Sequence, residues 1–230
     1  LVGSEMCIRD SAEHRKTLEN VICTAGKFGA THVSTFAGAW EGKPVESAYE
    51  EFGKVFRELA DLAEEKGVKL GIENCLMDGT WEHATCNIGF NPKAWEVMFE
   101  EVKNDNFGLE WEPTHQMVQL IDPVTELRKW CKKIVHIHGK DATIDWDAVR
   151  HSGISGAVPF VWHRMPGFGD TNWRDIISIL RSNGYEDDIC IEGYHDPVYN
   201  GELEMTGQLH ALNYLKWCRG GDFTQTPWEK

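Results

Sequence analysis

Four residues with metal-binding side chains stand at the ends of short apolar runs. They are Glu73 after "KLGI", Glu112 after "GLEW", His138 after "IVHI" and Glu192 after "ICI". Carboxylates combined with an imidazole suit a divalent ion such as Mn, Mg, Co or Zn. Three carboxylates brought together would repel one another and lose solvation unless a cation compensated for both effects. If the fold gathers these four residues at one point, they predict a site for one divalent metal ion.

The residue that precedes each of the four indicates the direction of its side chain. Those neighbours are all apolar: Ile72, Trp111, Ile137 and Ile191. Successive side chains of a strand point to opposite faces, so the apolar neighbours should face a layer of helices and the four polar residues should face the interior. Glu110 and His136 share the inward face at a deeper level, and we interpret them as structural or supporting groups. Cys75 and Cys190 are interpreted as core thiols rather than nucleophiles.

The elements that must position these residues alternate along the chain. Period-two apolar runs predict six strands, at residues 31–38, 68–74, 107–113, 134–141, 157–164 and 188–194. Amphipathic segments predict helices at residues 13–29, 46–67, 91–104, 122–133, 171–184 and 208–218. The gaps of 39, 26 and 54 residues between the four ligands match one, one and two strand–helix units. This order predicts an α/β chain with a parallel sheet.

The sequence favours a barrel over an open nucleotide-binding sheet. Neither GxGxxG nor GxxxxGK[ST] occurs in it. A barrel of parallel strands collects its functional residues at the carboxyl ends of several strands, which is where the four candidate ligands stand. We therefore predict a TIM (β/α)8-type barrel.

Composition limits the class of partner. The 230 residues include 23 basic and 37 acidic ones, and the net charge of -14 disfavours nucleic acid and anionic membranes. No apolar run approaches the roughly 20 residues of a membrane helix. Seven cysteines without a CxxC pair favour the reduced thiols of a cytoplasmic protein. Residues 1–11, "LVGSEMCIRDS", resemble translated adapter sequence, so we expect a non-native leader followed by a single barrel domain over residues 12–230.

Five motifs in order carry a resemblance to a known family. They are "GIEN", "EPTH…QLIDP", "HIHGKD", "PGFGDTNW" and "ICIEGYHD". Together they resemble the sugar phosphate isomerase/epimerase family of xylose isomerase-like TIM barrels, of the AP endonuclease family 2 type, over residues 13–218. The resemblance implies that Glu73, His138 and Glu192 bind one divalent metal. Glu112 stands where the family usually has aspartate, and its longer side chain would move the ion or change its ligand geometry.

The resemblance also implies substrate-binding residues and an incomplete barrel. His115 matches a histidine of the family's DPSH-type motif, and Arg164 matches a basic residue that contacts substrate. The family barrel has eight strands, and the six expected here match its last six. We therefore expect an amino-terminally truncated barrel whose first and last strands, in residues 31–38 and 188–194, are unpaired edges. Such edges favour association with another chain.

The activity that the resemblance implies is that of a metal-dependent isomerase or epimerase acting on a sugar, a sugar phosphate or a related polyol. Glu73 and Glu192 would remove a proton from one side of a carbon beside a carbonyl and return it from the other. A keto-polyol dehydratase would use the same groups. A non-catalytic sugar-binding module or an inactive fragment is the alternative outside enzymes. An apurinic endonuclease would need more zinc ligands and a basic face, which the net charge disfavours.

Overall fold

The computed structural model describes residues 11–221 and 224–226, which form two compact units. The first unit runs to Leu120 and adds residues 132–138 and 187–189, and the second unit contains the remainder. Residues 1–10 of the expected leader lie outside the described residues, whereas Ser11 begins helix α1 (Ser11–Ala25). The single domain expected over residues 12–230 stays a prediction.

A five-stranded sheet has the order β1-β2-β3-β4-β7. Its strands are β1 (His32–Thr35), β2 (Lys69–Glu73), β3 (Phe107–Trp111), β4 (Ile134–Gly139) and β7 (Ile189–Ile191). Strands β1 to β4 run parallel, as the alternation of helices and strands predicts. Strands β1 and β7 are the two ends of the sheet, so the described residues form an open half-barrel rather than a closed one. The TIM-type fold class is confirmed, and both expected edge strands are edges.

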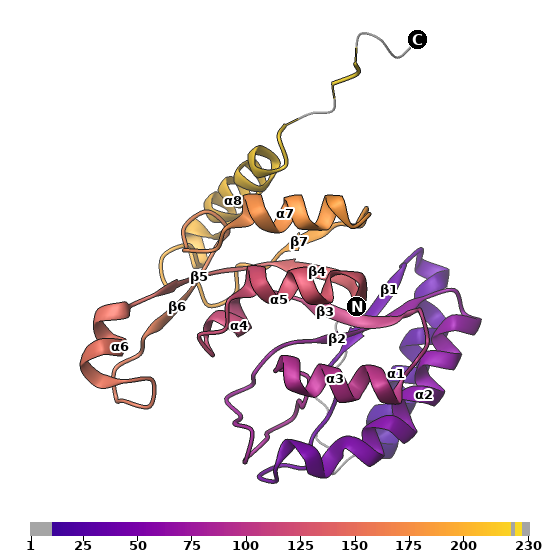
Figure 1. The fold of residues 1–230 in the computed structure, drawn as a ribbon. Coiled ribbons are helices and arrows are strands. Elements are labelled where there is room, and N and C mark those ends of the chain that lie inside the picture. Colours follow the sequence, from indigo (N-terminus) through magenta and orange to yellow (C-terminus); the bar gives the residue numbers. More distant parts are fainter. Residues whose placement is uncertain (1–10, 222–223, 227–230) are drawn as a thin grey trace. The chain divides into compact units, whose positions relative to one another are not determined.

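Three helices cover one side of the first unit's strands (Figure 1). They are α1, α2 (Tyr49–Glu65) and α3 (Pro92–Glu101). The apolar face of α2 buries Phe52, Phe56 and Leu59, and the Phe56 ring lies 6.2 Å from the Phe107 ring of β3. Asn91 caps α3 by accepting a hydrogen bond from the Lys93 backbone N–H. Apolar periodicity therefore accounts for α2, and a side-chain cap marks the start of α3.

Strand β3 is buried on both faces, as a central parallel strand should be. The backbone just before its neighbour β4 comes so close that a Cβ added to Gly108 would lie 2.3 Å from the Lys133 carbonyl oxygen. The pairing register shifts between Leu109 and Glu110, and Glu110 then pairs with His136. Past this irregularity, Glu110 of β3 and Glu112, one residue beyond β3, lie beside His136 and His138 of β4.

The second unit contains a two-stranded antiparallel sheet and four longer helices. The strands are β5 (Asp141–Ile144) and β6 (Val161–Arg164), and the helices are α5 (Pro123–Trp130), α6 (Trp146–Ser152), α7 (Trp173–Ser182) and α8 (Glu204–Cys218). Shorter helical segments elsewhere in the described residues are α4 (Thr114–Met117), η2 (Gly26–Phe28), η3 (Val45–Ala48), η4 (Cys131–Lys133) and η5 (Gly201–Leu203). The Asp141 carboxylate accepts hydrogen bonds from the backbone N–H groups of Ala142, Gly167 and Thr171 and so fastens the hairpin to the "PGFGDT" loop.

The hairpin corrects one expectation about the sheet. Residues 157–164 were expected to supply a sixth parallel strand, but β6 pairs antiparallel with β5 instead. Strand β4 is therefore followed in the sheet by β7, and the 54 residues from His138 to Glu192 cover one step of the sheet rather than two. The apolar run of a hairpin strand has the same local pattern as that of a parallel strand, so the sequence pattern does not reveal the partner.

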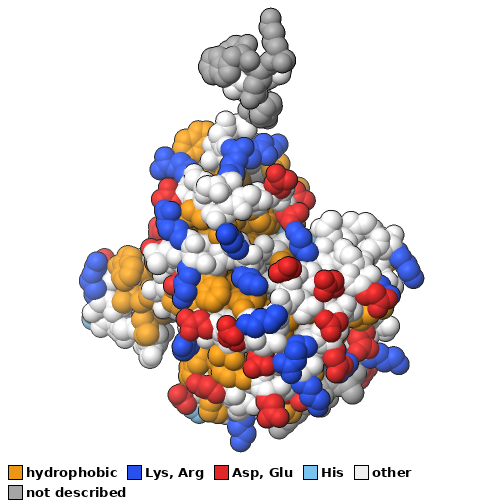
Figure 2. Space-filling model, turned by 45° about the vertical axis from the view of Figure 1, so that its right-hand side comes forward, with side chains coloured by type: hydrophobic (Ala, Val, Ile, Leu, Met, Phe, Trp, Pro, Cys, Tyr) orange, Lys and Arg blue, Asp and Glu red, His pale blue; other side chains and the backbone are white. Residues whose placement is uncertain are grey.

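The surface carries both signs of charge. Basic and acidic side chains are interspersed on the face drawn in Figure 2, with apolar side chains between them. Among the described residues, none of the helices has the length and apolar content that crossing a membrane requires.

Candidate metal centre

Glu73, Glu112 and His138 lie together in the first unit. His138 Nδ1 is 3.8 Å from Glu73 Oε1 and 3.7 Å from Glu112 Oε2. One ligand atom from each of the three lies within 4.8 Å of the others. These distances exceed ordinary hydrogen bonds. They approach the separation of about 3.3 Å between two ligands of one tetrahedral zinc ion. The donor set and its spacing therefore fit a divalent cation.

Two buried asparagines fix the backbone that carries these ligands. Asn74 Nδ2 donates to the Glu112 carbonyl oxygen at 2.9 Å, and Asn74 Oδ1 accepts from the Glu112 N–H at 2.8 Å. Asn87 Nδ2 donates to the carbonyl oxygens of Glu73 and Cys75 at 2.9 and 2.8 Å. Both asparagines are fully buried. The ends of β2 and β3 are thereby held in one arrangement, which sets the positions of Glu73 and Glu112.

The environment of Glu73 disfavours a negative charge. Burial raises its pKa to about 7, and the neighbouring carboxylates of Glu112 and Glu110 add to the effect. A bound cation would reverse this balance, because it favours the ionised carboxylate. The carboxylates are therefore crowded as the sequence predicts, and a bound metal ion would reduce the repulsion between them.

His138 has a carboxylate on its other side as well. Its Nε2 atom lies 3.3 Å from Glu110 Oε1. Burial alone would raise the pKa of Glu110, but contact with His138 lowers it below the usual range. A carboxylate that holds the second nitrogen of a histidine fixes the orientation of a metal ligand. Glu110, expected from the sequence to be structural, contacts a predicted ligand directly, and period two on β3 is the signal that places it on this face.

His115 belongs to the short helix α4 and lies against Glu112. Its Nε2 atom is 2.8 Å from Glu112 Oε1, and both side chains are almost completely buried. Burial lowers the pKa of His115, but Glu112 and Cys75 together outweigh that effect and raise the pKa to about 10. Cys75 and Glu73 lie near the same imidazole. One ligand atom from each of these three residues lies within 4.8 Å of the others. The substrate-binding role of His115 stays a prediction.

Glu192 and Arg164 belong to the second unit. Lys140 Nζ donates to Glu192 Oε1 at 2.7 Å, although the lysine side chain is buried. Arg164 Nε lies 3.3 Å from Asp196 Oδ2, and the guanidinium lies over the Phe168 ring at 5.7 Å. The ligand role of Glu192 and the substrate role of Arg164 stay predictions. Sequence reasoning assigned Lys140 no role, although its place directly before Asp141 in the "HIHGKD" motif marks it.

One assignment near the site is corrected. Cys190 was expected in the core, but it is exposed. It lies in β7, the last strand of the sheet in the described residues, so no further strand covers it.

Comparisons with known proteins agree with this architecture. The model of a family described as xylose isomerase-like TIM barrel matches residues 5–216. The chain belongs to the xylose isomerase-like TIM barrel family. A curated inosose dehydratase of Clostridium tetani is 26% identical over 182 residues, which are 77% of this chain and 57% of that protein. The chain thus spans little more than half the length of this relative.

The chain is also similar to a second curated protein with a different name and to a solved structure. A protein named inosose isomerase from Bacillus licheniformis is 25% identical over 202 residues, which are 86% of this chain and 67% of that protein. A crystal structure of a xylose isomerase-like TIM barrel protein from Mycobacterium smegmatis, in complex with magnesium, has a TM-score of 0.69 at 20% identity. The alignment covers 94% of this chain and 71% of that one. At this identity the structural likeness concerns the fold.

Proposed function

We propose that the chain belongs to a divalent-metal-dependent enzyme that removes a proton from the carbon beside a carbonyl group of a sugar or polyol. The observation that carries this proposal is the convergence of Glu73, Glu112 and His138 at one buried point of the first unit. The names of the relatives support a cyclic polyol ketone, an inosose, as the class of substrate to try first.

The residues that would hold the ion are Glu73, Glu112 and His138, with Glu192 as the predicted fourth ligand. When bound, a divalent ion such as Mn, Mg, Co or Zn polarises the substrate carbonyl and makes the adjacent C–H group more acidic. Glu112 can keep its contact with His115 through Oε1 while Oε2 faces His138. Glu110 would hold the His138 ring in place from its other nitrogen.

Glu73 is our candidate for the base that takes the proton. A bound cation would favour the ionised form of this carboxyl, which is the form that accepts a proton. We assign the return of the proton to Glu192, which would produce an epimer or an isomer. His115 and Arg164 would orient the substrate oxygens.

A dehydratase is the second candidate, and the inosose dehydratase relative favours it. The first step is the same: Glu73 takes the proton on the carbon beside the carbonyl. The C–O bond of the neighbouring hydroxyl group then breaks, and the leaving oxygen receives a proton and departs as water. We assign the donation of that proton to His115, whose Nε2 atom lies 2.8 Å from Glu112 Oε1. The product is an unsaturated ketone.

The test follows the hydrogen on the reacting carbon. The protein, loaded with Mn²⁺, is incubated with an inosose or a ketohexose in deuterated water and examined by NMR. Solvent deuterium should appear on the carbon beside the carbonyl. A new epimer or isomer then supports isomerase action, and an unsaturated ketone absorbing in the ultraviolet supports dehydration.

Two variants make this test specific. Glu73→Gln should slow deuterium incorporation by about 100-fold or more, as expected for loss of a general base. Glu202→Gln, at an exposed position of the second unit, is the matched control and should keep the wild-type rate. Retention of the substrate's own hydrogen in the product, or an undiminished rate in Glu73→Gln, would contradict the proposed mechanism.

A further inference from the structure

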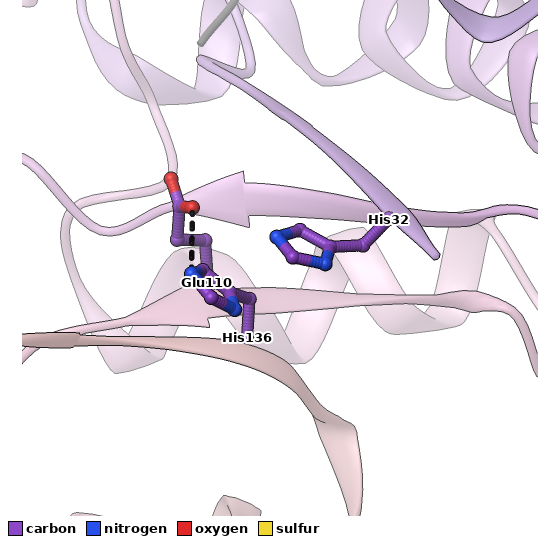
Figure 3. Close-up of side chains that lie close together, drawn as sticks. All are labelled: His32, Glu110 and His136. Carbon is purple, nitrogen blue, oxygen red and sulfur yellow. Dashed lines mark ion pairs between the residues drawn. The ribbon is translucent and has the colours of Figure 1, made fainter. Parts of the chain in front are cut away.

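A second group of potential ligands lies deeper on the inner face of the same sheet. It consists of His32 on β1, Glu110 on β3 and His136 on β4, and we name it the inner cluster. Figure 3 shows the His32 ring pointing from β1 toward Glu110 and His136. One ligand atom from each residue lies within 4.8 Å of the others, and His136 Nε2 is 4.0 Å from Glu110 Oε1.

The two imidazoles of the inner cluster are packed face to face. Their ring centroids are 3.9 Å apart and their planes differ by 22°. This contact brings two ring nitrogens, one from each histidine, to the same side of the sheet as the Glu110 carboxylate. Two imidazoles and a carboxylate are a donor set that zinc binds in proteins, with further coordination positions left open.

Two buried atoms of the inner cluster lack hydrogen-bond partners within the described residues. They are Glu110 Oε2 and His136 Nδ1, and the side chains that carry them are 2% and 3% exposed. Buried polar atoms are normally paired, so each unpaired atom calls for an explanation such as an ion or a water molecule. The unpaired carboxylate oxygen belongs to the residue that faces both histidines. It is therefore an independent indication that the inner cluster receives a ligand.

We propose that His32, Glu110 and His136 bind a second divalent cation of the zinc class. Zinc–nitrogen bonds are about 2.0–2.1 Å long, so ligand atoms must come to about 3.3 Å from one another. Stacked rings direct their nitrogen lone pairs along nearly parallel planes, so binding of one ion by both histidines requires the rings to turn out of the stack. His32 is only partly buried, which provides a route for the ion.

The inner cluster adjoins the candidate metal centre through Glu110. Glu110 Oε1 lies 3.3 Å from His138 Nε2, and Oε2 is the atom without a partner among the described residues. One carboxylate can therefore orient His138 through one oxygen and bind the second ion through the other. The inner cluster shares no ligand with Glu73, Glu112 and His138, so its occupancy does not rest on the proposed function.

The test counts metal ions. Metal-free protein is titrated with Co²⁺ against a competing chelator, the visible absorption of bound Co²⁺ is recorded, and the bound metal is measured by elemental analysis after dialysis. The wild-type protein should bind two equivalents. His32→Ala should bind one, because it removes a ligand of the inner cluster alone. His138→Ala should also bind one, because it removes a ligand of the candidate metal centre.

Matched variants keep the result interpretable. His83→Ala removes an exposed histidine outside both clusters and should still bind two equivalents. His136→Asn provides a second removal of an inner ligand, and circular dichroism confirms that each variant is folded. If the wild type binds one equivalent that His32→Ala abolishes and His138→Ala retains, the inner cluster is a metal site and the centre assigned to Glu73, Glu112 and His138 is not. If folded His32→Ala and His136→Asn keep the wild-type stoichiometry, the inner cluster is a stacked imidazole pair without an ion, and the proposal is overturned.

Discussion

At the scale of the residue, Glu73 links proton binding to folding. Its pKa is raised from the ordinary 4.5 to about 7, chiefly by burial. Without metal, the folded protein therefore keeps this carboxyl protonated between about pH 4.5 and pH 7, whereas the unfolded chain ionises it. Since the folded form binds the extra proton, the contribution of Glu73 to stability is complete below pH 4.5 and is lost as the pH rises through 7.

Replacement of Glu73 by glutamine should remove this pH dependence. The shift of 7 minus 4.5 units corresponds to about 3 kcal/mol at 1.36 kcal/mol per unit, which is an upper bound for a buried group near other charges. In the presence of a chelator, Glu73→Gln should be more stable than the wild type at pH 8 by up to that amount. At pH 4 the two proteins should be similar. Urea unfolding at both pH values measures the difference.

Glu110→Gln is the control, because it should change the stability at high pH in the opposite direction. The pKa of Glu110 is lowered by His138, so its contribution to stability is present at neutral pH and is lost as the pH falls. This variant should be less stable than the wild type at pH 8. A Glu73→Gln protein that is less stable than the wild type at pH 8 would contradict the effect assigned to burial.

Sequence reasoning reached Glu73, Glu112 and His138 because a strand's period of two is a local property. The same reasoning placed Glu110 and His136 on the inward face. It did not predict the 3.3 Å contact between Glu110 and His138. That contact depends on the register of β3 against β4, which shifts beside Glu110. Register is set between strands, so a single strand's pattern does not contain it.

At the scale of the element, the order of helices and strands was predictable and the hairpin was not. Apolar periodicity and glycine or asparagine at the ends were enough for α2 and α3. The pattern of residues 157–164 indicated a strand, but its partner β5 follows directly after Gly139 and Lys140. Only Lys140 separates the end of β4 from the start of β5, so no turn motif marks the boundary between the two strands.

Gly108 on β3 packs tightly against the chain around the start of β4. A Cβ at this residue would meet the Lys133 carbonyl oxygen at 2.3 Å and the Val135 side chain at 2.6 Å, and a backbone atom cannot turn aside. Gly108→Ala should therefore destabilise the protein by about 1–3 kcal/mol or more, as overpacking of a core does. It should also weaken metal binding, because it displaces the strands that carry Glu112 and His138.

Thermal unfolding and Co²⁺ affinity measure the two effects of Gly108→Ala. Gly26→Ala is the matched control in the same unit, since its Cβ would meet only the Lys66 carbonyl oxygen at an ordinary 3.6 Å. Equal melting temperatures for Gly108→Ala and Gly26→Ala would contradict the prediction, because they would show that β3 and β4 can move apart without loss of stability.

At the scale of the whole molecule, the chain carries an apolar surface on α8. Met205, Leu209 and Leu212 are 75%, 59% and 41% exposed, and their spacing of four and three residues places them on one face of the helix. Such a patch favours association. The expectation of self-association from the sequence concerned the edge strands, and α8 adds a second candidate surface.

Replacement of Met205 and Leu209 by lysine should reduce self-association without unfolding the protein. Both side chains are exposed, so the free energy of unfolding should change by less than about 0.5 kcal/mol per site. Sedimentation velocity over a range of concentrations measures association, and binding of the dye ANS reports the apolar surface. Ala211→Lys is the contrast on the same helix, because Ala211 is fully buried and its replacement should lower the melting temperature. Unchanged sedimentation and ANS binding in the double variant would show that α8 takes no part in association.

The division into two units has a consequence for how this protein can be dissected. The chain passes from one unit to the other after Leu120, Cys131, His138, Glu186 and Ile189. Neither unit is therefore a continuous stretch of sequence, and no single cleavage of the backbone releases one of them whole. A gene fragment that ends at any of these crossings would leave at least one unit without part of its own chain. Complementation between two separately expressed fragments, rather than expression of either fragment alone, is the arrangement that can restore both units.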